Sequence, residues 1–110
     1  MTYVKINNIL YPARISGKMK DPSWDGRSTK TIRLKMTYEE AIQIFVDNIS
    51  WSIIEDFSEG EGDEEPIIQE FDNSEYNLAG NIIDHRDGTI SAVMGKITDT
   101  ELLEIIMGGN

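Results

Sequence analysis

The 110-residue chain contains no cysteine, and this absence limits the folds and sites that it can have. Disulfide bonds and thiolate metal ligands are excluded, so the fold does not depend on an oxidising compartment. The chain also lacks any stretch near the ~20 apolar residues of a membrane-spanning helix, and its N-terminus has no apolar run of signal-peptide length. We therefore expect a cytoplasmic protein that does not contact membranes.

Basic side chains are scarce after residue 36. Residues 1–36 hold eight Lys and Arg and two acids, whereas residues 37–110 hold two basic residues and eighteen acids, for a net charge of −10 overall. Such asymmetry determines electric fields and partners rather than fold. Because the acidic excess repels polyanions, a protein partner or self-association is favoured over nucleic acid.

Alternating strands dominate the rest of the sequence. The length fits one domain, residues 1–110, with a radius of gyration of roughly 13 Å. Residues 29–36 alternate in polarity, and turn-forming pairs, Asn7-Asn8 and Asp87-Gly88, divide other β-rich runs. We predict an α+β fold with about six or seven short, mostly antiparallel strands and two short helices against one sheet face.

Two capping boxes predict where the helices begin. Thr37 with Glu40 opens an apolar-periodic segment that predicts a helix over about 38–48, and Thr98 with Glu101 opens a second. The second helix has one apolar face, made of Leu102, Leu103, Ile106 and Met107. A β-hairpin pattern precedes each helix, which predicts two ββα units. True repetition and chance resemblance remain open alternatives.

An acidic segment interrupts the pattern at residues 58–66, where we predict a mobile surface loop. Clustered carboxylates can bind a hard cation such as calcium, and the candidate ligands are Glu61, Asp63 and Glu65. The spacing does not match an EF-hand loop, and charge runs are usually solvated surface. We therefore expect no metal and no other cofactor.

A basic face is predicted on two paired strands. Its members are Arg14, Lys18, Lys20, Arg33 and Lys35. Such a face suits a partner surface, although outward Lys and Arg also protect sheet edges from aggregation. Few aromatic side chains lie among these residues to stack on nucleic-acid bases.

Trp24 lies in the loop "PSWDGR", close to Arg27. A Trp beside an Arg on a Pro/Gly loop has the composition of a protein–protein hot spot. Alternatively, the indole folds back over the core, as large aromatic side chains usually do. Both interpretations stay open at the level of sequence.

His85 is the only histidine, and acids flank it at Asp84 and Asp87. A single His without Cys makes a weak metal site, and neither a serine elbow nor a nucleotide-binding glycine motif is present. The sequence therefore favours a protein that is not an enzyme.

The stretches "YPARISGKM…SWDGRSTKTIRLKMTYEEAI…F" and "YNLAGNIIDHRDGTISAVMGK" together resemble small uncharacterised proteins encoded in phages and prophages of Gram-positive bacteria. The resemblance implies a phage morphogenesis component or accessory factor, such as one at the tail or baseplate, and hence a place in the virion. It supplies no active-site residues.

The leading hypothesis is a non-enzymatic interaction or assembly protein, whose partner-binding candidates are Trp24, Arg27, Arg14, Lys18, Arg33 and Lys35. One alternative is an acidic regulator or inhibitor that binds a basic protein. Another is a small metal-dependent enzyme centred on His85.

Overall fold

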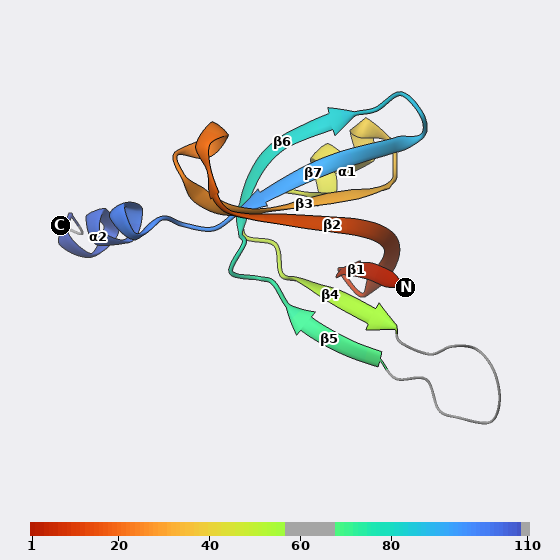
Figure 1. The fold of residues 1–110 in the computed structure, drawn as a ribbon, viewed down its shortest axis with the longest axis horizontal. Helices are drawn as coiled ribbons and strands as arrows, with labels where there is room; N and C mark the ends of the chain where they lie inside the picture. The colour runs from red at the N-terminus through yellow and green to blue at the C-terminus, as the bar shows by residue number, and fades with distance from the viewer. Residues whose placement is uncertain (57–67, 109–110) are drawn as a thin grey trace.

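The computed structural model describes residues 1–56 and 68–108, which form a single antiparallel sheet with two α-helices (Figure 1). The sheet order is β5-β4-β1-β2-β3-β7-β6, and every pairing is antiparallel. The predicted α+β class is therefore confirmed. In chain order the elements are β1 (Thr2–Ile6), β2 (Ile9–Asp21), the 3-10 turn η1 (Pro22–Trp24), β3 (Arg27–Lys35), α1 (Tyr38–Ile44), β4 (Trp51–Asp56), β5 (Ile68–Asp72), β6 (Leu78–Asp84), β7 (Thr89–Gly95) and α2 (Asp99–Met107).

Both predicted turns join antiparallel strands. Asn7 and Asn8 have positive φ values of 53° and 64°, as a two-residue turn of this hand requires, and they join β1 to β2. Between β6 and β7 the positive φ values fall on Arg86 and Gly88. The turn chemistry in the sequence thus located two of the hairpins.

Pro12 marks a change of partner along β2. Residues Ile9–Pro12 pair with β1, and pairing with β3 begins at Ala13. Proline has no N–H to donate to a ladder, so it is tolerated where one pairing ends and the other begins. This staggered pairing lets one long strand connect the two halves of the sheet.

The two predicted ββα units share this sheet. The β2–β3 hairpin and the β6–β7 hairpin join through their second strands, with Ile32 opposite Ala92. Whether they are a true repeat stays a prediction, because shared topology alone does not test it.

One hydrophobic core joins the elements on the α1 side of the sheet. Val4 and Ile6 of β1 belong to the same buried cluster as Ile32 of β3 and Ala41 of α1, and Trp51 of β4 is almost fully buried. The remaining buried members are Leu34, Met36, Ala41, Phe45, Ile90, Ala92 and Met94. The even-numbered positions of β3 and β7 therefore face this core.

Helix α1 is shorter than the predicted 38–48 and ends at Ile44. Tertiary hydrogen bonds redirect the chain after it. The Ala79 N–H donates to the Asp47 carboxylate at 2.8 Å, and the Asn48 N–H donates to the Asn77 carbonyl at 2.7 Å. These bonds to the β6 region replace the next helical turn, which the apolar periodicity alone could not indicate.

Helix α2 does not lie against the sheet, which corrects the prediction of two helices on one face. It projects from the end of β7 (Figure 1), and Leu103 and Ile106 of its apolar face are exposed. The radius of gyration is 16.0 Å instead of the predicted ~13 Å, and the longest extent is 59 Å. The helical period correctly indicated an apolar face, but it could not indicate whether another element covers that face.

Candidate functional site

The predicted basic face exists on β2 and β3, and part of it borders a hollow. Arg14 and Arg33 lie directly opposite each other, and Lys35 follows two residues further on the same face of β3. The hollow has a volume of about 890 Å³. We call it the basic groove, and its lining includes Tyr11, Pro12, Ala13, Arg14, Arg33 and Lys35.

Two of the groove's three basic side chains have no ion pair among the described residues. Arg33 binds the Asp87 carboxylate at 3.0 Å, and its Nε donates to Thr89. Within the described part of the chain, Arg14 and Lys35 form no such pair. The Tyr11 and Ala13 side chains pack against the core on the other face of the sheet. The groove therefore combines uncompensated positive charge with the apolar surface of Met1 and Pro12, which suits an acidic, amphipathic ligand.

Lys18 and Lys20 lie further along β2, away from the groove lining. β1 pairs with β2 only as far as Pro12, so no described strand pairs with that edge of β2 beyond this point. Lysines along an open edge typically discourage edge-to-edge aggregation. The structure thus divides the predicted basic face into a groove and a charged edge.

Trp24 folds back onto the sheet, but it is not among the residues that pack against the hydrophobic core, so the second sequence interpretation is correct about the fold-back and wrong about the core. Its ring lies over Gly80 of β6 and Gly95 of β7, where an added Cβ would come within 2.7 Å of the indole. The Arg27 guanidinium stacks on the same ring, 4.7 Å from its centroid. Both glycines are needed for this close approach, and the indole is only partly exposed.

Arg27 is buried and joins the sheet to α2. Its two terminal nitrogens bind both oxygens of Glu101 at 2.7 and 3.1 Å, and one also donates to the Lys96 carbonyl at 3.2 Å. The hydrogen bonds that Glu101 accepts from Arg27 and from the Thr98 N–H lower its pKa from 4.5 to about 2. The Arg27 side chain is therefore occupied within the chain and holds α2 in place.

The apolar face of α2 is the feature that the sequence interpretation placed wrongly. Asp99, Leu102, Leu103, Ile106 and Met107 follow the helical i, i+3, i+4 spacing; we call them the α2 stripe. Its four apolar members are between 45% and 79% exposed. At about 100° per residue, Glu101 projects from the opposite side of the helix, so the Arg27 tether turns the stripe away from the sheet.

His85 forms a hydrogen bond to the buried Ser91 hydroxyl, with 2.7 Å between Nε2 and Oγ. Nothing in the sequence indicated this side-chain hydrogen bond between β7 and the β6–β7 turn. Among residues 1–56 and 68–108, no group of three or more His, Asp or Glu side chains could hold a metal ion. The hypothesis of a metal-dependent enzyme centred on His85 therefore gains no ligand set from these residues.

The predicted acidic loop and its candidate ligands, Glu61, Asp63 and Glu65, lie outside the described residues. The alternative of an acidic regulator rests mainly on that segment, so the structure does not bear on it.

No protein-family model matches the chain, and no curated protein or solved structure matches it significantly. Neither described helix is long and apolar enough to cross a membrane.

Proposed function

We propose that the chain is a non-enzymatic interaction or assembly protein that presents α2 to a protein partner. The exposure of the α2 stripe supports this proposal most directly. Four large apolar side chains in one contiguous stripe are costly to leave in water, and exposed apolar patches usually mark interaction surfaces. Glu104 and Glu101 make the other side of the helix acidic.

The attachment of α2 also supports a binding role. Thr98 and Glu101 form a complete capping box, and the Arg27–Glu101 pair fixes the first turn to the sheet. A nine-residue helix is marginal in isolation, so these two contacts hold it ready for a partner. Preformed helices lose less conformational freedom on binding.

The resemblance to phage and prophage proteins supports a role in phage assembly. A tail or baseplate is built from many protein–protein contacts, and an exposed helix is a common way to make one. We propose the virion or its assembly intermediates in the cytoplasm as the location of the protein.

Site-specific photocrosslinking tests the proposal. p-Benzoylphenylalanine replaces Ile106 in the stripe, and in a matched control it replaces Glu104 on the polar side of the same helix. We expect one adduct of defined mass from position 106 in cells that express the chain, repeated from position 102, and little from position 104. Equal, diffuse crosslinking from all three positions would show that α2 is not a binding element.

A further inference from the structure

We propose that the α2 stripe of one copy docks into the basic groove of another copy, so that the chain assembles head to tail. This inference rests on the proposed function and names the partner as a second copy of this chain. Three observations favour a second copy of the chain as the partner: the charges of the stripe and the groove, their apolar components and their positions in the molecule.

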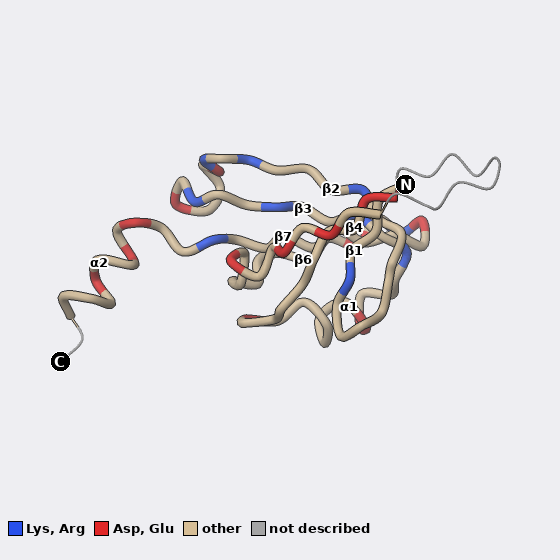
Figure 2. Tube along the Cα trace, turned by 90° about the horizontal axis from the view of Figure 1, so that it is seen from below, with Lys and Arg blue, Asp and Glu red and all other residues tan. Residues whose placement is uncertain are grey.

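The charges are complementary. α2 has three acids, Asp99, Glu101 and Glu104, and no Lys or Arg, whereas cations occur along β2 and β3 (Figure 2). Glu101 is already paired with Arg27, but Asp99 lies within the stripe and is exposed. Arg14 and Lys35, which have no ion pair among the described residues, can meet it in the groove.

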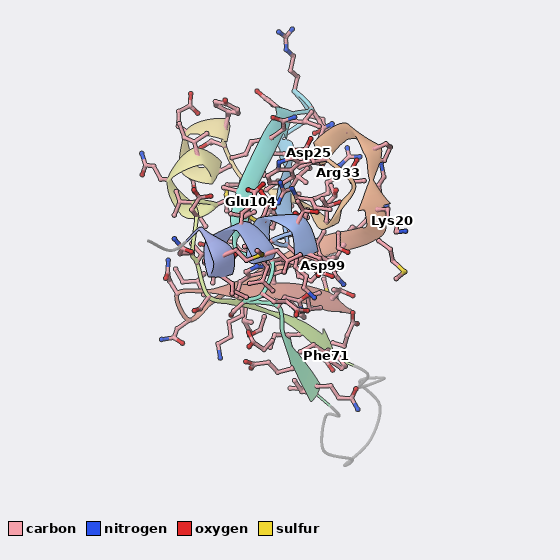
Figure 3. All side chains as sticks on the ribbon, turned by 90° about the vertical axis from the view of Figure 1, so that its left-hand side faces the viewer. Lys20, Asp25, Arg33, Phe71, Asp99 and Glu104 are labelled. Carbon is pink, nitrogen blue, oxygen red and sulfur yellow. The ribbon has the colours of Figure 1, made fainter. Side chains whose placement is uncertain are left out.

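The apolar components also match. The groove offers the exposed side chains of Met1 and Pro12 beside its cations, in a hollow of about 890 Å³. Leu102, Leu103 and Ile106 project from α2, which stands in front of the sheet in Figure 3. A short amphipathic helix that binds a groove contacts it through side chains at positions i, i+3, i+4 and i+7, which is the spacing of the stripe.

The positions of the two surfaces exclude docking within one chain. Arg27, which holds Glu101, lies eight residues before Lys35 on β3, a separation of roughly 27 Å at the rise of a strand. The nine residues of α2 span only about 13 Å. While the Arg27–Glu101 pair holds, α2 cannot reach its own groove.

The stripe and the groove are different surfaces at opposite ends of the molecule, so a contact between them is heterologous. α2 lies at one end of the long axis and the N-terminus, which borders the groove, at the other (Figure 1). A head-to-tail contact leaves one unused surface at each end, so it continues into a ring or a filament. Because charged rims contribute, association should weaken as salt screens them.

Two double variants and their mixture test the inference by light scattering on a sizing column. Leu103→Glu with Ile106→Glu removes the stripe and leaves the groove intact. Arg14→Glu with Lys35→Glu removes the groove and leaves the stripe intact. All four side chains are exposed, and Glu at position 14 would face Arg33 across the strands, so both variants should stay folded.

We expect wild-type protein to form oligomers that dissociate at high salt, and each variant alone to associate at least about tenfold more weakly. An equimolar mixture of the two variants should form dimers and nothing larger, because it contains one working stripe and one working groove per pair. The control Lys18→Glu with Lys20→Glu makes the same charge change on β2 outside the groove and should associate as wild type does.

Three results would overturn the inference. They are wild-type protein that stays monomeric at every concentration and salt, a groove variant that associates as tightly as wild type, and a mixture that stays monomeric. Circular dichroism on each variant shows that the fold persists. A monomeric wild type whose position 106 still crosslinks to one different protein would end the head-to-tail inference and leave the proposed function standing.

Discussion

Arg27 and Glu101 determine where α2 stands, and their contact depends on ionisation. The Arg27 side chain is 4% exposed and that of Glu101 39% exposed, so one charge is buried while its partner remains in contact with water. Removing the carboxylate charge would leave the guanidinium buried without its main partner. The sequence showed both residues, but it assigned Arg27 to a partner surface because 74 positions separate the pair.

The first prediction concerns the effect of low pH on the attachment of α2 to the sheet. The pKa of Glu101 falls from 4.5 to about 2 because Arg27 and the Thr98 N–H hydrogen-bond its carboxylate. A lowered folded-state pKa means that the attachment of α2 is fully stabilised above about pH 4.5 and weakens as pH falls through about 2. We expect the Thr98 amide resonance to titrate with a midpoint near 2, because that N–H donates to Glu101.

Glu101→Gln should abolish this titration and detach α2 at neutral pH, which amide exchange would detect. Glu104→Gln on the same helix is the matched control and should leave the Thr98 titration unchanged. A Thr98 midpoint near 4.5 in the wild-type protein would show that the ion pair does not hold in solution.

At the scale of elements, α1 and α2 begin alike and end in different environments. Thr37 and Thr98 both accept a hydrogen bond from the N–H three residues on, at 3.1 Å in each helix. In α1 the Glu40 carboxylate accepts from the Thr37 hydroxyl, whereas in α2 the Glu101 carboxylate completes the box through the Thr98 N–H. Both N-caps were predictable because they depend on neighbours in the sequence, but the complete capping box predicted at Thr37 forms only at Thr98.

The second prediction compares these caps. Thr37→Ala should lower the free energy of unfolding by about 1 kcal/mol, measured by urea denaturation, because α1 packs on the core. Thr98→Ala should leave that free energy nearly unchanged and speed amide exchange in α2 by about fivefold, since α2 lies outside the core. An equal loss of global stability from both substitutions would show that α2 unfolds together with the sheet.

At the scale of the whole molecule, one core connects both halves of the sheet. Trp51 of β4 and Val4 of β1 belong to the same buried cluster as Ile90 and Met94 of β7. The Trp51 indole also donates to the Tyr76 carbonyl at 3.0 Å, which ties β4 to the segment before β6. A single cluster of this kind should unfold as one cooperative unit.

The third prediction tests that cooperativity with the two tryptophans, which report on different halves. Trp24→Phe leaves Trp51 as the fluorescent probe, and Trp51→Phe leaves Trp24. In each variant the fluorescence and circular-dichroism transitions in urea should coincide, and Trp51→Phe should cost roughly 1–3 kcal/mol because the Tyr76 carbonyl loses its donor. Separate midpoints within one variant would show two independent units.

The sequence by itself determined the strands, the turns and both helix caps, because each depends on residues within a few positions. It also indicated the basic face, since alternation assigns Arg14, Arg33 and Lys35 to one side of their strands.

Only the tertiary structure decided which surfaces meet. It ended α1 at Ile44 through bonds to the β6 region, folded Trp24 onto two glycines and left the α2 stripe uncovered. Periodicity shows that a face is apolar, but what covers that face depends on contacts between segments far apart in the chain.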